Sequence, residues 1–276
     1  MASSVIYYTA PDHYRMIVNS TSEAAATGTD KQYMVDSNLD TIFQPVNANN
    51  QDIFIDTYPQ DAGSYAAGRG KTSGSHEAIC IWLNNYDTDF SSTDVFFSSL
   101  ANVDDSGSSE PKSWTHLGGP LWFVDLDTPL IYRYIRINMP NLPAVPKIGQ
   151  IMALKKYTLN RPNQYPVEDL PEYLNNTRVT PAGVKHTYRS SKNPVIHFMR
   201  NYSLFFPADH TMVENIFNDC EGEVNPFIIQ EGTVVTDAYM CKMDMDEGKW
   251  QDVSYQFRTN QFIFTSLPYI RDGENY

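Results

Sequence analysis

The chain has 276 residues and a mass of 31.4 kDa, which suffices for one large domain or two modest domains, each with its own core. It carries 33 Asp and Glu against 20 Lys and Arg, a net charge of −13, and its basic residues never run longer than two. This balance argues against binding to a nucleic-acid backbone or an anionic membrane surface. No stretch reaches the roughly 18 apolar residues that a membrane helix requires, so we expect no membrane insertion.

The compartment of synthesis is indicated by the N-terminus and the cysteines. The first residues lack the basic and apolar regions of a secretory signal peptide. Cys80, Cys220 and Cys241 are far apart and odd in number, which favours buried thiols in a reducing cytosol, with one disulfide as the alternative. We therefore expect the protein to be made in a cytoplasm.

Short apolar segments separated by turn residues fill the first part of the chain. Segments 63–74 and 104–111 are rich in Gly, Ser and Asp and predict exposed loops. Many short strands punctuated by turns are typical of a sandwich or jelly roll, so we predict a jelly-roll β-sandwich over 1–160. The expected strands lie at 52–56, 78–83, 94–97, 121–126, 132–138 and 147–154.

The middle of the chain predicts a linker over 161–183. Prolines at 162, 166, 171 and 181 argue against a regular element there. A small antiparallel α+β domain with one helix is then expected over 184–276. Its expected strands lie at 186–189, 195–200, 225–229, 234–240 and 249–258, the last with apolar residues at every second position.

One helix is predicted over 207–222. Asp209 is expected to cap its start, and Gly222 to supply the left-handed stop. The apolar residues expected on its buried face recur at helical spacing: Met212, Val213, Ile216, Phe217 and Cys220.

Catalytic motifs are missing, and we predict that the chain is not an enzyme. There is no phosphate-binding loop, dinucleotide fingerprint, His-Glu-x-x-His or Gly-x-Ser-x-Gly motif, and the six histidines are scattered. The pair His76–Glu77 and the acidic segment 243–248 are read as solvated turns rather than as an acid–base pair and a calcium loop. No cofactor is expected beyond a structural Ca²⁺.

Aromatic residues in loop-like segments are candidates for sugar binding, because a ring face stacks on the C–H face of a sugar. Tyr65 and Trp114 lie in such segments and are predicted ligand-binding residues. Trp82 and Trp122 lie inside apolar runs and are expected in the core.

Two segments together resemble the discoidin-like jelly roll, the galactose-binding-like fold of coagulation factor 5/8 type C domains. Segment 34–43, Met-Val-Asp-Ser-Asn-Leu-Asp-Thr-Ile-Phe, is similar to that family's early loop, with Ser37 and Phe43 where Gly and Trp are usual. Segment 132–137, Tyr-Arg-Tyr-Ile-Arg-Ile, looks like its late strand, and the resemblance spans about 20–157. It implies a structural Ca²⁺ in the early loop, whose ligands would be Asp36, Asn38 and Thr41.

A narrower resemblance, to tail-tip and baseplate proteins of tailed bacteriophages, extends over nearly the whole chain. It rests on segments 78–85, 132–138 and 148–154, followed by a helix, a Pro-Phe segment at 221–228 and an aromatic strand at 250–257. It implies a structural subunit of the virion tail, at the tail tip, baseplate or distal tail ring. Its partners would be itself in a ring, other tail proteins and host surface glycans.

Two other functions remain open. A non-catalytic carbohydrate-binding module protein, with loop aromatics at the sugar, is the main alternative. A glycan-active enzyme would require two carboxylates roughly 5–10 Å apart, which the sequence does not reveal.

Overall fold

The computed structural model describes twenty segments of the chain. They are residues 4–9, 16–21, 30–36, 38, 41–57, 76–85, 88–98, 111–118, 120–130, 134–160, 164–172, 175–181, 183, 185–189, 195–205, 207–220, 225–230, 238–244, 251–254 and 257–266. The chain forms two compact units, one of residues 7–156 and one of residues 1–6 and 157–276. It passes between them within β1 (Val5–Thr9) and β10 (Ile148–Thr158).

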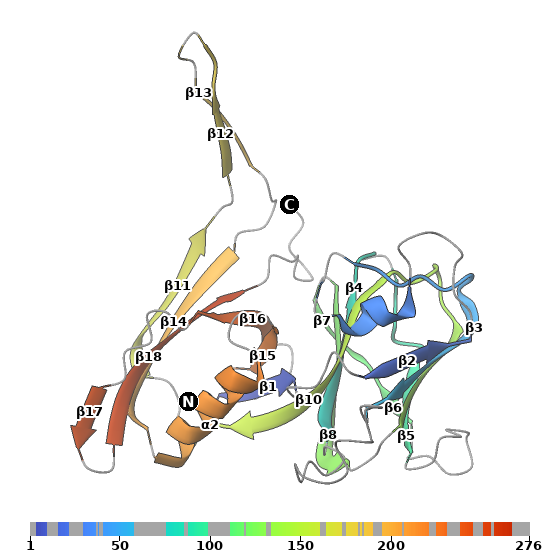
Figure 1. The fold of residues 1–276 in the computed structure, drawn as a ribbon, viewed down its shortest axis with the longest axis horizontal. Helices are drawn as coiled ribbons and strands as arrows, with labels where there is room; N and C mark the ends of the chain where they lie inside the picture. Colours follow the sequence, from blue (N-terminus) through green and yellow to red (C-terminus); the bar gives the residue numbers. More distant parts are fainter. Residues whose placement is uncertain are drawn as a thin grey trace, which may run out of the picture. The chain divides into compact units, whose positions relative to one another are not determined.

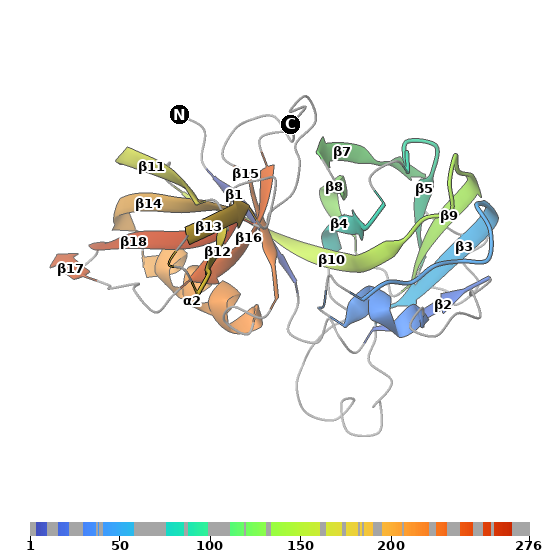
Figure 2. The same ribbon diagram turned by 90° about the horizontal axis from the view of Figure 1, so that it is seen from above.

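The unit of residues 7–156 is a sandwich of two antiparallel sheets (Figures 1 and 2). The five-stranded sheet has the order β2-β3-β9-β5-β6, and the opposite sheet has the order β1-β10-β4-β8-β7. The strands are β2 (Ile17–Ser20), β3 (Asn49–Asp56), β4 (His76–Leu83), β5 (Asp94–Ser98), β6 (Lys112–Ser113), β7 (Thr115–Gly118), β8 (Leu121–Leu130) and β9 (Tyr134–Asn141). Non-consecutive strands pair in both sheets, so the predicted mainly-β, jelly-roll architecture is confirmed.

The core of this unit lies between the two sheets. From the five-stranded sheet it receives alternate residues such as Ile53, Val95 and Ile135, all fully buried. The opposite sheet contributes Ile79 and Val124 in the same alternating way. The 3₁₀ helix η2 (Lys31–Val35) adds two further apolar side chains. The period-two pattern of the sequence is therefore the pattern of the core.

A polar cluster lies beside the sheet of β4, β8 and β10. The Tyr7 hydroxyl donates to Asp125 Oδ2 at 3.0 Å, and Lys156 Nζ lies 2.9 Å from the same oxygen. The Lys156 ammonium also lies 5.4 Å from the centroid of the Tyr7 ring, and its backbone N–H donates to Glu77. Burial, followed by the nearby Asp125 carboxylate, raises the pKa of Tyr7 far above its usual value. Tyr7 is therefore a permanent hydrogen-bond donor at physiological pH.

The second unit contains an antiparallel sheet of order β11-β14-β18-β16-β15, with β17 paired to β18, and a separate hairpin of β12 and β13. Helix α2 (Pro207–Asp219) lies against β14 and β18 (Figure 1). The strands are β11 (Gln164–Glu172), β12 (Asn175–Val179), β13 (Lys185–Arg189), β14 (Val195–Phe205), β15 (Phe227–Gln230), β16 (Ala238–Asp244), β17 (Gln251–Ser254) and β18 (Phe257–Ser266). In the described residues no helix is long and apolar enough to cross a membrane.

Helix α2 confirms the predicted buried face but not the predicted cap. Val213, Ile216 and Cys220 are fully buried. The helix begins at Pro207, a residue suited to a first helical position. Asp209 therefore lies in the first turn, and its buried Oδ1 accepts from the Tyr157 hydroxyl at 2.6 Å and from the Asn160 side-chain amide at 2.7 Å. The carboxylate ties the helix to the end of β10 instead of capping it. The predicted stop at Gly222 lies outside the described residues.

Two sequence-based expectations about this unit are wrong. Segment 162–181 is not irregular, because β11 includes Pro166 and Pro171. Among the described strands, β11 is the edge of its sheet and pairs only with β14, so a residue without an N–H is tolerated there. Segment 249–258 is not one strand, because Ser254 of β17 pairs with Phe257 of β18 and the chain reverses between them.

The three cysteines are free thiols and are all buried. Burial raises the pKa of the Cys80 thiol well above its ordinary value. The structure therefore agrees with the expectation of buried thiols and contains no disulfide among these three residues.

Candidate functional site

The predicted calcium residues Asp36, Asn38 and Thr41 form a turn just after η2. Asp36 Oδ1 accepts the backbone N–H of Asn38 at 2.9 Å, and its Oδ2 accepts the Thr41 hydroxyl at 2.8 Å. The Thr41 hydroxyl oxygen also lies 2.7 Å from the Asn38 carbonyl oxygen. Both oxygens of the Asp36 carboxylate are thus bonded within the turn itself.

This turn fits a self-bonded loop better than a calcium site. Ca²⁺ takes six to eight oxygen ligands, including carboxylates, whereas the described part of the loop offers one carboxylate that is already occupied by two donors. The described residues contain no group of three His, Cys, Asp or Glu that could hold a metal. The calcium site at Asp36, Asn38 and Thr41 stays a prediction.

The structure places Trp114 in the core rather than on a surface loop. Its side chain is only 6% exposed, and its ring packs edge-on against Phe90 with the centroids 5.9 Å apart. The short strands β6 and β7 on either side draw this residue into the sandwich, which turn-like composition could not reveal. Trp82 and Trp122 are buried as expected. Tyr65 lies outside the described residues. So do the predicted loop 63–74, all but the last residue of the predicted loop 104–111, and residues 245–248 of the acidic segment.

A second candidate site was not predicted from the sequence: the outer surface of the five-stranded sheet. Phe54 of β3 and Phe96 of β5 both pair in register with Arg136 of β9. The residues on either side of each are core residues, so the side chains of these three point away from the core. All three are half-buried. We call this row, together with Asp52 and Asn138, the Arg136 face.

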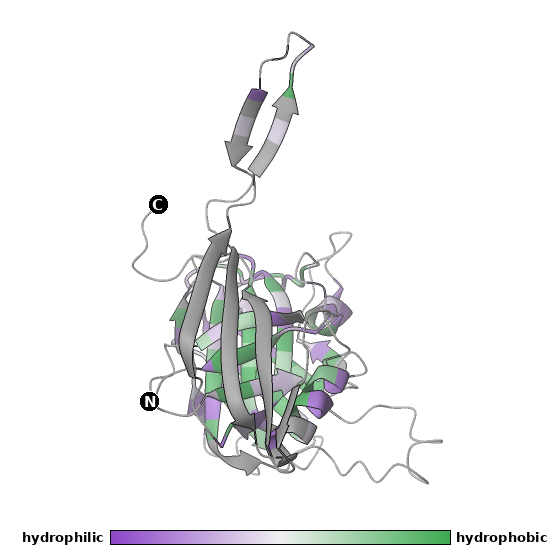
Figure 3. Cartoon of the chain, turned by 90° about the vertical axis from the view of Figure 1, so that its left-hand side faces the viewer, coloured by the Kyte–Doolittle hydropathy of each residue, from purple (hydrophilic) through white to green (hydrophobic). Residues whose placement is uncertain are grey.

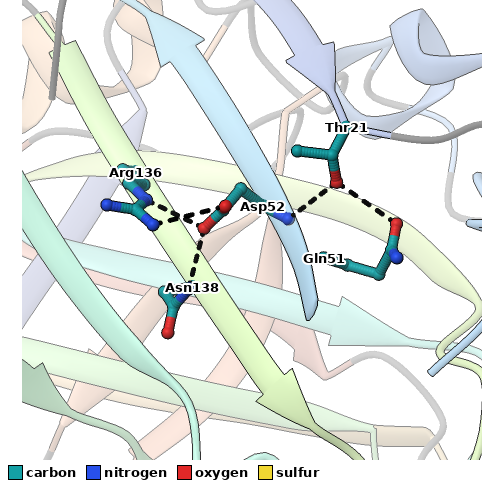
Figure 4. A network of polar contacts seen from close by, with 5 residues as sticks. All are labelled: Thr21, Gln51, Asp52, Arg136 and Asn138. Carbon is teal, nitrogen blue, oxygen red and sulfur yellow. Dashed lines mark hydrogen bonds and ion pairs between the residues drawn. The ribbon is translucent and has the colours of Figure 1, made fainter. Parts of the chain in front are cut away.

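The Arg136 face is held by an ion pair and two cation–π contacts. The Arg136 guanidinium carbon lies 5.9 Å from the centroid of Phe54 and 5.7 Å from that of Phe96. Its Nε lies 2.8 Å from Asp52 Oδ1, which also accepts the Asn138 amide at 2.9 Å (Figure 4). The guanidinium is therefore fixed in position between two rings.

A second layer of hydrogen bonds fixes Asp52. Its backbone N–H donates to the Thr21 hydroxyl oxygen at 3.0 Å, and that hydroxyl lies 3.2 Å from Gln51 Oε1 (Figure 4). The Gln51 amide in turn donates to Asn47 Oδ1 and to the Asn49 carbonyl. Because Gln51 is buried and fully bonded, the strand end that carries Asp52 is rigidly placed.

This arrangement offers the groups of a binding site. It offers aromatic carbon, a fixed cation, a carboxylate and an amide within one short row, which is the mixture of groups that recognises polyhydroxylated ligands. The sequence feature that corresponds to the Arg136 face is the alternation of polar and apolar residues in Asp52–Asp56 and Tyr134–Asn138. That alternation shows which residues face outwards but not which residues of different strands lie side by side.

Comparisons with known proteins identify similar sugar-binding modules. No protein-family model and no curated protein matches the sequence. The family 32 carbohydrate-binding module of Clostridium perfringens NanJ, solved with galactose, is 15% identical, with 54% of this chain and 99% of the module covered and a TM-score of 0.38. A second C. perfringens family 32 module, solved with GalNAc-β-1,3-galactose, is 12% identical over 52% and 98% of the two chains, with a TM-score of 0.39. A fucose-binding module of Streptococcus pneumoniae is 15% identical over 52% and 94%, with a TM-score of 0.38.

Proposed function

We propose that this chain is a non-catalytic glycan-binding protein and that its sandwich holds the sugar at the Arg136 face. The observation that carries this proposal is the row in which two aromatic rings flank a guanidinium already fixed by a carboxylate. Sugars present both C–H faces and hydroxyl groups, so they match a surface of rings and charged hydrogen-bonding groups.

The dimensions of the row favour an extended ligand. Phe54, Arg136 and Phe96 lie on three neighbouring strands, so the outer two are separated by two strand spacings, about 10 Å. A short oligosaccharide laid across the strands meets a ring, the guanidinium and the second ring in turn. Its hydroxyl groups can accept from Arg136 and Asn138 and donate to Asp52.

Preorganisation supports binding at this face. The Arg136 and Asp52 side chains are each 17% exposed and bonded to one another, so they reach solvent while their geometry is fixed. A ligand therefore does not have to order these side chains when it binds, and this reduces the entropic cost of association.

Isothermal titration calorimetry of the full chain tests this proposal, with galactose, fucose and GalNAc-β-1,3-galactose as probes because similar modules bind them. We expect binding that weakens at least about tenfold in Phe54→Ala and in Phe96→Ala, the loss of one stacking contact. Val46→Ala is the matched control, since Val46 is an exposed apolar residue outside the face. Equal affinity in all four proteins, with unchanged melting temperatures, would place the sugar elsewhere; no binding of any glycan on an array would reject the function.

A second candidate function is that of a structural subunit of a bacteriophage tail. It is favoured by the order of elements in the second unit, where α2 is followed by the buried Pro226–Phe227 at the start of β15 and then by the antiparallel pair of β17 and β18, which divides the expected aromatic strand 250–257 in two. This is the order that the tail-protein resemblance implies. Immunogold electron microscopy of particles from the source culture tests it: gold at one end of a tailed particle is expected, and gold absent from every particle would reject it.

A further inference from the structure

A second row of side chains runs beside the aromatic row on the outer surface of the five-stranded sheet. Asn138 of β9 pairs in register with Asp52 of β3 on one side and with Asp94 of β5 on the other. Each of the three lies two residues along its strand from a member of the aromatic row, so both rows point away from the core. Figure 3 shows how hydrophilic and hydrophobic residues follow one another along the strands. Asp94 therefore adjoins the Arg136 face at its β5 end.

The two carboxylates of this second row differ in their contacts. Asp52 is bonded to the Arg136 guanidinium and to the Asn138 amide. The Asp94 side chain is half-buried and makes no hydrogen bond or ion pair with any residue that the structure describes. A carboxylate that has lost part of its hydration without gaining a partner gains stability from a cation. The β5 end of the row therefore favours a positively charged ligand group.

An unused hydrogen-bond acceptor lies next to Asp94. The Asn138 amide donates through its nitrogen to Asp52, and Figure 4 shows its oxygen turned away from that carboxylate. Within the described part of the chain, no donor is bonded to this oxygen. Opposite residues of neighbouring strands have Cβ atoms about 5 Å apart, so a single ligand group can bind both Asp94 and Asn138. Since both are acceptors, that group has to be a donor.

An ammonium group meets these requirements. It has three N–H donors and no acceptor, and its charge is opposite to that of Asp94. The Phe96 ring, two residues along β5, supplies an aromatic surface beside it. The whole chain has a net charge of −13, which attracts cationic ligands over a longer range. A sulfated or carboxylated sugar would instead bring a like charge to Asp94.

We propose that the Arg136 face selects glycans that carry a free amino group and that Asp94 holds the ammonium of the amino sugar. This inference rests on the proposed glycan-binding function and names the class of glycan. Phe54, Arg136 and Phe96 receive the sugar rings and hydroxyl groups, and Asp94 distinguishes a free amine from its acetylated form. Acetylation removes the positive charge and leaves one N–H donor, so an N-acetylated sugar loses the charged contact with Asp94.

Isothermal titration calorimetry of the full chain at about pH 5.5 tests the proposal, because carboxylates are ionised and amines are protonated at this pH. The probes are two pairs of sugars that differ only in acetylation. One pair is the tetrasaccharides of glucosamine and of N-acetylglucosamine, and the other is galactosamine and N-acetylgalactosamine. In at least one pair we expect the free amine to bind at least about tenfold more tightly than the acetylated sugar. Raising NaCl from about 0.05 M to about 0.5 M should reduce this advantage.

Asp94→Asn is the decisive variant, because it removes the charge and keeps the size of the side chain. It should weaken binding of the free amine at least about tenfold and leave binding of the acetylated sugar within about twofold. Glu214→Gln is the matched control, since it removes the same charge from an exposed position of α2 and should bind as the wild type does. Melting temperatures followed by circular dichroism check that both variants are folded.

Three results would overturn the proposal. They are equal binding of both members of each pair, an equal loss of both in Asp94→Asn, and tighter binding of a lysine tripeptide with the same dependence on Asp94, which would make a basic peptide the ligand. If neutral glycans bind and weaken in Phe54→Ala while the amine gives no advantage, this inference fails and the proposed function stands. If no glycan binds, amino sugars included, both fail.

Discussion

Arg136 and Asp52 form a two-bond ion pair across β9 and β3, with Nε 2.8 Å from Oδ1 and Nη2 3.3 Å from Oδ2. The two residues are not opposite one another: Arg136 pairs in register with Phe54, and Asp52 with Asn138. The guanidinium therefore reaches diagonally across the sheet, and in doing so it lies over two rings. The ion pair and the aromatic row are one structure.

A double-mutant cycle measures this coupling. We expect Arg136→Ala and Asp52→Ala to show a coupling free energy of about 1 kcal/mol in urea unfolding, the value of a well-aligned but partly solvated pair. Arg136→Ala should destabilise more than Asp52→Ala, because it also removes packing on both rings. A coupling indistinguishable from zero would mean that the ion pair does not order the face.

Because of Tyr7, the free energy of unfolding should fall at alkaline pH. Burial and Asp125 raise its pKa above the usual 10.0, so the folded state holds the phenolic proton more tightly than the unfolded state. The stabilisation is complete below about pH 10 and is lost as pH rises further, by about 1.4 kcal/mol per pH unit. In Tyr7→Phe this loss is absent, although the variant is about 1 kcal/mol less stable at neutral pH.

Urea unfolding of both proteins at about pH 6, 8 and 11 checks this expectation. The difference between wild type and Tyr7→Phe should be constant from about pH 6 to 8 and should shrink or reverse by about pH 11. A difference that stays constant across the whole range would show that the hydroxyl titrates alike in both states.

Asp209 should be the most sensitive polar position of α2. Asp209→Ala removes a buried carboxylate that accepts from the half-buried Tyr157 hydroxyl and the exposed Asn160 amide. We expect it to reduce the free energy of unfolding by about 2 kcal/mol, the contribution of hydrogen bonds to a charged group. Asp209→Asn keeps an acceptor oxygen and should lose only about 1 kcal/mol. Thermal and chemical unfolding followed by circular dichroism measure these losses, with the exposed Glu214→Ala as the control that should change little. Equal effects of Asp209→Ala and Glu214→Ala would contradict this role.

The cysteines should be inert in the folded protein. Since all three are buried and free, we expect no reaction with Ellman's reagent under native conditions and reaction of all three in concentrated guanidinium chloride. Reducing agent should not change the melting temperature. Rapid labelling of one thiol in the native protein, or fewer than three thiols after unfolding, would contradict this structure.

Asn50 should tolerate glycine but not a branched side chain. Its φ is +51° at the start of β3, a conformation open to Asn and Gly. Asn50→Gly should leave the free energy of unfolding unchanged, and Asn50→Val should reduce it by about 1–2 kcal/mol. The neighbouring exposed Asn49 serves as the control, and Asn49→Val should reduce the free energy of unfolding only slightly. Equal losses at both positions would show that backbone strain is not the cause.

The sequence predicted the sandwich because its strands obey a simple local rule. Ile135 and Ile137 are buried and Tyr134 and Arg136 are half-buried, as the alternation around them indicates. The helix was predicted equally well, because Val213, Ile216 and Cys220 recur at helical spacing. Local periodicity is sufficient where one face of an element is buried and the other is not.

Prediction from the sequence failed where the decisive information comes from residues that are far apart in the chain. Trp114 has the turn-like neighbours of a surface residue, and only the pairing of β6 with β5 and of β7 with β8 draws it inside. The Arg136 face needs the register of three strands that are far apart in the chain, which no pattern within a single strand contains. Pro171 is compatible with a strand only because β11 is the edge of the sheet, and a sequence does not state which strand is outermost.

The prolines of β11 also determine how copies of this protein can meet. An outermost strand ordinarily offers a row of N–H and C=O groups to which another chain can add. Pro166 and Pro171 have no N–H to offer, and the register shift between Gln164 and Glu168 breaks the regular spacing of the strand. The long sheet of the second unit is thereby protected at this border against indiscriminate growth into aggregates, while contacts made through side chains stay open to it.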